Sequence, residues 1–424
     1  MKKATTFLRQ YQVTLAFAAI CILAYLFAGQ SFSYVLSEVM SRFCRNIVLV
    51  LALLIPVTAG LGLNFSIVVG AIAAQVAFIL VTHWHIGDAA GILLVFAIST
   101  PLAILFGWLV GRLFNKTKGQ EMITGMIVGF FANGIYQLVF LVLVGTLIPF
   151  VDENLMILGG IGIRDTVTLE PSLQKLIDKI LQVKFHNALL ILAGVLLAVA
   201  VVRVVRAAHA AKKGGEKLRL AGCLTPFLPP AIVGALYLAF CFVPTLNFAA
   251  KFTNVPVITL VIAALIAGMC TFLLKTKLGQ DFRAVGQDRI VSEAAGINVD
   301  QKRIIANILS TVIAAWGQIL YVQNMTSFQT YSAHEKVGTY AVAAILIGGA
   351  SIKRATISQA IIGTILFHTL FVLAPQAGNN LFGDPTYGEY FRVFVAYAVI
   401  VIALVMHAMR EAKERRLEAH AINR

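Results

Sequence analysis

The chain has 424 residues, of which 59% are apolar and only 12% are charged, and its formal net charge is +15. Ordinary globular domains carry about 25% charged residues, and apolar runs of about 18 or more residues recur along this chain, which excludes a soluble protein. A transmembrane β-barrel would show alternating segments of about ten residues, and no such pattern is visible. We therefore expect an all-α fold, a polytopic integral membrane bundle of about 10–12 helices.

The expected spans place most of the positive charge on one side of the membrane. With the N-terminus in the cytoplasm, most of the 34 Lys and Arg residues fall in cytoplasmic segments, which is the positive-inside bias. The charge therefore needs no nucleic-acid partner, and we expect both termini of a multi-pass inner-membrane protein in the cytoplasm. The first apolar run is long and no small-residue cleavage site follows it, which favours a membrane anchor over a signal peptide. The expected spans are residues 11–29, 46–63, 64–82, 89–114, 122–150, 187–206, 226–247, 255–274, 304–323, 338–350, 356–374 and 391–409.

A weak helix sequence lies where the second expected span meets the third. Residues 57–70 read VTAGLGLNFSIVVG and follow Pro56. We expect either a tight cytoplasmic turn over 59–64 or a helix broken within the membrane, which is tolerated only where the backbone is buried in protein or lines a cavity. The run from Asn46 to Val57 covers only about 18 Å of a core that is about 30 Å thick. Unless the helix begins near Tyr34, the break is expected inside the membrane.

The longest external loop is expected over residues 151–186. Within it, residues 171–185 (PSLQKLIDKILQVKF) have helical periodicity, with Lys and Asp opposite an apolar stripe. Such a helix can lie on the membrane surface or cap the bundle, or it can form a docking surface for an extracytoplasmic partner. The apolar stripe comprises Leu173, Leu176, Ile177, Ile180 and Leu181.

The most polar cytoplasmic segment is residues 274–303. A connector needs only about 4–6 residues, whereas this segment is far longer and carries charges around the helical pattern DRIVSEAAG, with Gly296 well placed to end that helix. We expect a rigid charged surface that faces a cytosolic protein, and a merely solvated loop is the alternative. The expected working residues are Asp281, Arg283, Arg289, Glu293 and Gly296. Two further cytoplasmic segments are expected, a basic connector at 203–219 and a helical tail at 409–424.

The expected spans hold uncharged polar residues and essentially no deep charge. A proton- or sodium-coupled transporter usually carries buried Asp or Glu. The chain has neither a GxxxxGK[ST] phosphate-binding loop nor a catalytic or metal-binding motif. We therefore expect no enzyme activity, no metal site and no cofactor in this chain, but a channel-like subunit that a partner drives through residues 274–303. The alternative is a secondary transporter or facilitator that acts without an ATPase.

Four uncharged polar residues are candidates for the wall of a solute pathway. They suit a neutral hydroxylated solute, which must be released as well as bound. Hydrogen bonding between helices is the alternative role for such residues. The candidates are Asn64, Ser66, Asn133 and Gln137.

Three motifs resemble the ribose/branched-chain amino acid type of ATP-binding-cassette (ABC) importer permease. They occur in that family's order and cover the chain from about residue 40 to its end: AGLGLNFSIVVGAIAAQ, GQDFRAVGQDRIVSEAAGINVDQKRIIAN and TYAVAAILIGGAS. The sequence departs from the family pattern in three places. Asn64 stands where an Asp is often found, Lys353 and Arg354 replace a glycine pair, and the loop over 151–186 is longer than expected. These departures leave the substrate class open.

The resemblance implies a permease subunit of an ATP-driven importer, folded as a single transmembrane domain over residues 1–424. Such an importer has two permease subunits, identical or paralogous, with two cytosolic ATPases and usually an extracytoplasmic solute-binding protein. The resemblance also implies a small neutral solute, such as a simple sugar or a nucleoside. It assigns residues 274–303 to the transmission of ATPase closure to the membrane bundle.

Overall fold

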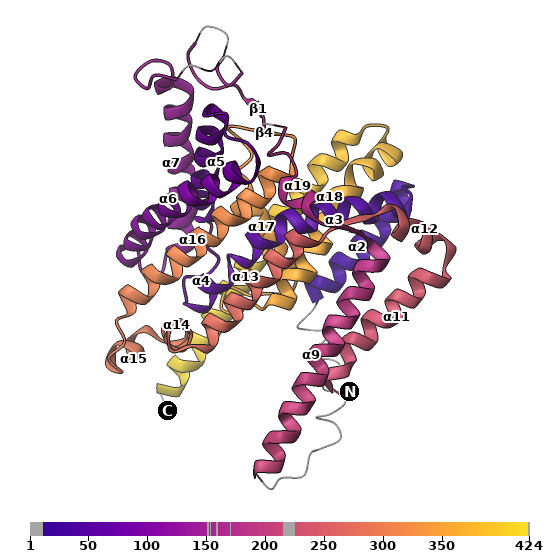
Figure 1. The fold of residues 1–424 in the computed structure, drawn as a ribbon. Helices are drawn as coiled ribbons and strands as arrows, with labels where there is room; N and C mark the ends of the chain where they lie inside the picture. The colour runs from indigo at the N-terminus through magenta and orange to yellow at the C-terminus, as the bar shows by residue number, and fades with distance from the viewer. Residues whose placement is uncertain are drawn as a thin grey trace. The chain divides into compact units, whose positions relative to one another are not determined.

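The computed structural model describes residues 12–422, apart from residues 151, 153, 158–159, 170 and 215–224. The first half of the chain forms α2 (Gln12–Ala28), α3 (Phe32–Leu51), α4 (Leu54–Thr58), α5 (Ile67–His83), α6 (Asp88–Lys116), α7 (Glu121–Gln137), the π-helical turn η1 (Leu138–Leu143), β1 (Thr166–Thr168), α8 (Leu176–Ile180), β2 (Gln182–Lys184) and α9 (Phe185–Gly214) (Figure 1). The second half forms η2 (Thr225–Phe227), α11 (Leu228–Phe242), α12 (Pro244–Phe252), β3 (Asn254–Pro256), α13 (Val257–Lys275), α14 (Lys277–Gln287), α15 (Arg289–Ala294), α16 (Val299–Asn324), β4 (Ser327–Gln329), α17 (Val337–Ile347), α18 (Ile357–Phe382) and α19 (Pro385–Ile422).

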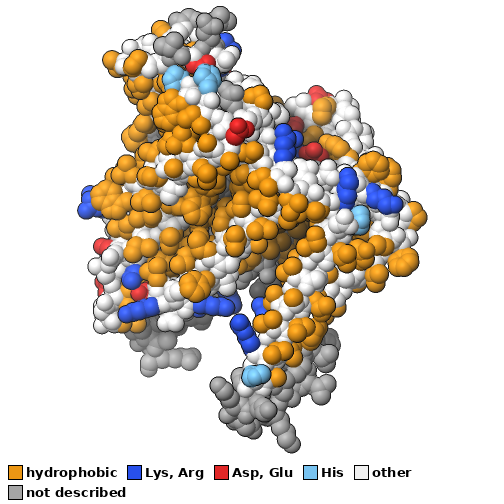
Figure 2. All heavy atoms as spheres, viewed as in Figure 1, with side chains coloured by type: hydrophobic (Ala, Val, Ile, Leu, Met, Phe, Trp, Pro, Cys, Tyr) orange, Lys and Arg blue, Asp and Glu red, His pale blue; other side chains and the backbone are white. Residues whose placement is uncertain are grey.

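Seven helices in the described part of the chain are long and apolar enough to cross a membrane, and the bent pair α11–α12 makes an eighth. Three more apolar helices, α2, α5 and α17, are shorter. Hydrophobic side chains cover most of the face seen in Figure 2, and Phe130 and Phe131 of α7 are 65% and 68% exposed. Lipid can cover such surfaces, and helices satisfy their own backbone hydrogen bonds within it. The expected fold class, a polytopic helical membrane bundle, is therefore confirmed.

The chain forms two compact units. The larger comprises residues 1–29, 42–177 and 259–424, and the smaller comprises residues 30–41 and 178–258. In the larger unit, α16 packs against both α5 and α6, and small residues allow this close approach. A Cβ at Gly107 would lie 2.8 Å from the Cα of Ile308, and one at Gly70 would lie 2.3 Å from the oxygen of Thr311. In the smaller unit, α9 packs against α11, and β2 pairs antiparallel with β3. The single domain expected from the sequence stays a prediction.

The break expected after Pro56 is present. The helix α4 ends in a Schellman motif, in which the N–H of Leu61 donates to the oxygen of Pro56 at 3.0 Å and Gly60 has a φ of +72°. Residues 61–66 are buried in the protein, as broken backbone in a membrane protein requires. The expected start of this span was wrong, however, because α3 begins at Phe32 rather than near residue 46. With 27 residues over Phe32–Thr58, the chain before the break is long enough to span, so length no longer requires a break inside the membrane.

The helix expected over residues 171–185 is wrong in its extent. The structure has only the short helix Leu176–Ile180 before β2 at residues 182–184, and α9 begins at Phe185. The N–H of Lys175 donates to the oxygen of Gln323 at 2.6 Å, and the φ of Lys175 is +54°, which is incompatible with a continuous helix. The predicted apolar stripe is accordingly divided, since Leu173 and Ile177 are buried whereas Ile180 and Leu181 are exposed.

Two other expected segments are partly described. The connector at 203–219 begins as the end of α9, and its residues 215–219 lie outside the described residues. The tail expected at 409–424 does continue the last helix, because α19 extends to Ile422, while residues 423–424 and the charged side chains of the tail lie outside the described parts.

Candidate functional site

Residues 274–303 include two short helices, α14 and α15, which lie between α13 and α16. The side chain of Asp288 caps α15 by accepting from the N–H of Val291 at 3.1 Å. The helix ends in a second Schellman motif, with Gly296 at φ +81° and the N–H of Ile297 donating to the oxygen of Ser292 at 3.0 Å. The helix and cap predicted over DRIVSEAAG are therefore confirmed, whereas the preceding helix α14 was not predicted. We call α14 and α15 together the coupling pair.

The five residues expected to work in this segment divide into two groups. Arg283 in α14, Glu293 in α15 and Gly296 just after α15 are exposed. The other two point into the protein, where Asp281 accepts from Lys302 at 2.8 Å and Arg289 donates to Glu121 at 2.6 Å. The sequence did not single out two exposed apolar residues on the same surface, Ile290 (79% exposed) and Val291 (64% exposed).

A buried ion cluster anchors the coupling pair to the bundle. Glu121, the first residue of α7, accepts through one carboxylate oxygen from the Nη2 of Arg289 in α15, from the Nη2 of Arg303 in α16, and from the N–H of Gly119 at 3.0 Å. Arg303 is fully buried, and its Nη2 also donates to the oxygen of Phe114 at 3.3 Å. Sequence reasoning missed Glu121. The only indication in the sequence was an acidic residue at the start of an expected helix, close to the basic residues where the preceding span ends. A buried charge of this kind requires a partner, so the cluster fixes three helices to one another.

A contact between two glycines joins the coupling pair to the break after α4. A Cβ at Gly60 would lie 2.7 Å from the Cα of Gly286, and a Cβ at Gly286 would lie 2.3 Å from the oxygen of Thr58. The backbones of α14 and of the break therefore touch directly, with no space for a side chain between them. Figure 1 shows α4, α14 and α15 at the same end of the larger unit.

Asn64 and Ser66 belong to a buried hydrogen-bond network. The Nδ2 of Asn64 donates to the Oδ1 of Asn307 at 2.9 Å, and its Oδ1 accepts from the hydroxyl of Ser66 at 2.6 Å. Asn307 in turn donates to the oxygen of Gly107 at 2.8 Å, and the hydroxyl of Ser310 donates to the oxygen of Ala52 at 2.8 Å. The network ties the break to α6 and α16. Hydrogen bonding between helices was the alternative role for these residues, and the network makes such bonds. A role for Asn64 and Ser66 in the solute pathway stays a prediction.

The other two expected pathway residues lie on α7. Gln137 is the exposed last residue of that helix, and Asn133 is half-buried. The Nε2 of His334 donates to the Oδ1 of Asn133 at 2.8 Å, and the ring of Tyr136 packs edge-on against His334 at 4.7 Å. The structure thus brings Asn64 together with Ser66, but places Asn133 and Gln137 elsewhere.

His334 is expected to make the fold sensitive to acid. It is fully buried in the turn before α17, and burial lowers its pKa to about 4. Because the unfolded chain has a pKa of about 6.5 at this residue, it binds more protons than the folded protein below that pH. This residue should therefore cost no stability above about pH 6.5, and roughly 3 kcal/mol as the pH falls towards 4. Thermal unfolding of His334→Gln and of the unchanged protein between pH 7.5 and 4.5 should show a flatter profile for the variant, and equal slopes would contradict the assignment.

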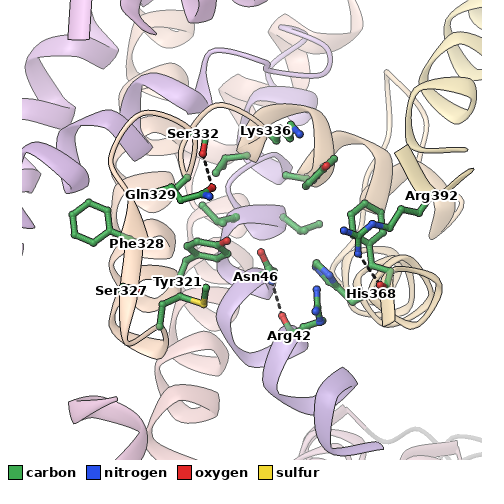
Figure 3. Close-up of a pocket in the computed structure, with 18 of the residues that line it drawn as sticks. Arg42, Asn46, Tyr321, Ser327, Phe328, Gln329, Ser332, Lys336, His368 and Arg392 are labelled. Carbon is green, nitrogen blue, oxygen red and sulfur yellow. Dashed lines mark hydrogen bonds between the residues drawn. The ribbon is translucent and has the colours of Figure 1, made fainter. Parts of the chain in front are cut away.

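A cavity of about 570 Å³ opens in the larger unit, beyond the network just described. Its lining comes from α3, the end of α16, β4 and the turn after it, α17, α18 and α19, together with Thr166 of β1, which pairs with Gln329 of β4 (Figure 3). None of the four expected pathway residues lines it. On α16, Arg303 belongs to the ion cluster and Tyr321 lines the cavity. The rise per residue of an α-helix places these two residues about 27 Å apart along the helix axis. The cavity and the coupling pair therefore lie towards opposite ends of one buried helix.

The fold combines multi-pass helices around a polar cavity with a charged helical pair anchored to them. This is the architecture of a membrane transport permease. The chain belongs to the permease family described as branched-chain amino acid transport system / permease component, whose model matches residues 35–406. The resemblance carried by the three sequence motifs is thereby confirmed.

Two curated proteins show which relatives the chain has. The nucleoside ABC transporter permease protein NupB of Lactococcus lactis subsp. cremoris is 28% identical over 152 residues, which cover 36% of this chain and 39% of that protein. The probable ABC transporter permease protein YphD of Escherichia coli is 28% identical over 166 residues, which cover 39% of this chain and 49% of that protein. The chain thus spans less than half the length of either relative. No solved structure matches it.

Proposed function

We propose that this chain is the translocation subunit of an ATP-driven ABC importer, and that its solute belongs to the sugar and nucleoside class. The observation that carries the proposal is the attachment of the coupling pair to the bundle at two points, the Glu121 cluster and the Gly60–Gly286 contact. A surface built only for solvation has no need of a buried ion cluster beneath it. The family and the printed names of both relatives support the same class of transporter.

The coupling pair is the proposed docking surface for a cytosolic ATPase. Its exposed face combines the charges of Arg283 and Glu293 with the apolar side chains of Ile290 and Val291. A protein interface usually has an apolar core surrounded by a polar rim. In this role the chain hydrolyses no ATP itself. Motion of the docked ATPase is transmitted to the break by Gly286, and it is transmitted to α16 by Arg289. The coupling pair, the basic connector and both termini are then cytoplasmic.

The remaining parts of the transporter follow from this assignment. A second permease subunit, identical or paralogous, completes the translocation unit, and an extracytoplasmic binding protein delivers the solute at the cavity end of α16. The other partner is the lipid bilayer, and no nucleic acid takes part. The nucleoside named for NupB is one candidate solute, and a simple sugar is another.

The docking proposal predicts that Arg283→Ala combined with Glu293→Ala blocks ATP-driven uptake. Truncation of interface hot spots costs about 2 kcal/mol or more, so uptake should fall by about 30-fold at limiting ATPase. Both side chains are exposed, so the variant should keep the thermal stability of the unchanged protein. The measurement is uptake into proteoliposomes that contain the permease with its ATPase and binding protein.

Lys116→Ala provides the matched control, because Lys116 is an exposed charge on α6 outside the coupling pair. It should leave uptake unchanged. The competing function is a facilitator or secondary transporter. Solute movement by the purified permease alone, without an ATPase, would establish that function and end the importer proposal.

A further inference from the structure

Three cationic side chains line the cavity, and its described lining contains neither Asp nor Glu. Arg42 comes from α3, Lys336 from the turn before α17 and Arg392 from α19, and Figure 3 shows them on three sides of the cavity. Glu389, one turn before Arg392, accepts from the Nη2 of Arg392 and offsets the charge of that arginine. Guanidinium and ammonium groups in such an arrangement recognise carboxylate or phosphate oxygens.

Aromatic and amide side chains form the rest of the recognition surface. The rings of Tyr321 and Tyr340 line the cavity. Such rings pack against the face of a sugar or a base. Hydrogen bonds fix two amides beside them: Asn46 donates to the oxygen of Arg42 at 2.8 Å, and Gln329 accepts from the hydroxyl of Ser332 at 2.6 Å (Figure 3). The cavity volume is within the range of about 300–1,000 Å³ that small-molecule sites have.

We propose that this cavity binds the transported solute, and that the solute carries an anionic group, a carboxylate or a phosphate, on a hydroxylated or planar ring. The inference rests on the proposed function and deepens it, since it selects the acidic members of the sugar and nucleoside class. It departs from the neutral solute expected from the spans. The departure has a physical source, because Arg42 lies inside α3, whereas its position lies outside the expected spans.

Direct binding to the full-length permease in lipid nanodiscs tests the proposal without any ATPase. The probes are two matched pairs, glucose with glucuronate and uridine with uridine 5′-monophosphate. The acidic member of at least one pair should bind about tenfold or more tightly than its neutral partner, since a hydrogen bond to a charged group contributes that much. The pair that responds tells whether the group is a carboxylate or a phosphate. Lys336→Gln should remove most of the difference, and Lys336→Arg should retain it.

Lys116→Gln removes an exposed cation outside the cavity and should change nothing, which separates cavity binding from general attraction to a basic protein. Equal binding of both members of each pair, undetectable binding of all four probes, or unchanged acid binding by Lys336→Gln would overturn the inference. None of these results depends on ATP-driven uptake. The importer proposal therefore stands or falls separately, by the proteoliposome experiment.

Discussion

Replacing Glu121 with Gln is expected to destabilise the protein by about 3–5 kcal/mol, because removal of one partner from a buried ion pair leaves the other charge uncompensated. Glu121 is 7% exposed, and Arg303, which depends on it, is fully buried. The midpoint of thermal unfolding in nanodiscs should fall accordingly. Arg289 should lose its anchor at the same time, so ATP-driven uptake should fall further than the loss of folded protein explains.

Asp300→Asn is the matched control for this prediction. Asp300 pairs with Lys118 at 3.5 Å near the same end of α16, but both side chains are about half exposed. An exposed pair contributes only about 0–1 kcal/mol, so this variant should unfold near the temperature of the unchanged protein. If Glu121→Gln and Asp300→Asn lowered the unfolding midpoint equally, the cluster would not be the anchor of the coupling pair.

A double variant separates the structural role of the cluster from its coupling role. Apolar replacement of a buried ion pair by residues of similar volume is often neutral or stabilising. Glu121→Leu with Arg303→Met should therefore recover most of the lost stability. Arg289 would still lack its carboxylate, so uptake should remain low. Full recovery of both properties would show that the tether through Arg289 has no part in coupling.

The membrane fold could be predicted from sequence because its main signals are local. Apolar runs mark the helices, and Pro56 with the following glycines marks the break, which the Schellman motif at Gly60 then forms. Gly296 likewise ends α15 through a C-terminal glycine motif, which depends only on the residues at that end of the helix. The start of α3 was misplaced because Glu38, Arg42 and Arg45 interrupt its apolar pattern, although the structure keeps them helical.

The site could be predicted only in part because its contacts join distant segments. Arg289 and Glu121 are separated by 168 positions, and no periodicity links them. The same holds for Gly60 and Gly286, whose contact depends on how α14 folds back onto the break. Asn64 was recognised from its polarity and from its place in the motif at the break, but its partners on α16 could not be named. The cavity was missed because most of its lining lies at the ends of several helices and in the turns between them.

Because Gly60 and Gly286 are in contact, Gly286→Ala is expected to uncouple transport while the protein stays folded. Alanine favours a helix over glycine by about 1 kcal/mol, so α14 itself should be stabilised. The new Cβ, however, would lie 2.3 Å from the oxygen of Thr58 and 3.0 Å from the nitrogen of Gly60, both of which are backbone atoms. The coupling pair must therefore move away from the break. Coupling between sites is commonly about 1–3 kcal/mol, so uptake per ATP hydrolysed should fall by about 5–150-fold.

Gly268→Ala tests whether the effect belongs to this contact. Gly268 lies inside α13, and a Cβ there would meet no atom within 4 Å, so the same chemical change should leave uptake unaltered. Uptake and ATP hydrolysis are measured together in proteoliposomes, with thermal unfolding as the check on folding. Continued ATP hydrolysis with little uptake in Gly286→Ala is the expected result, since the ATPase can still dock on a displaced coupling pair. Normal uptake in that variant would mean that motion of α14 reaches the bundle through Arg289 and the Glu121 cluster alone. Glu121→Gln and Gly286→Ala are therefore complementary measurements of one mechanical linkage.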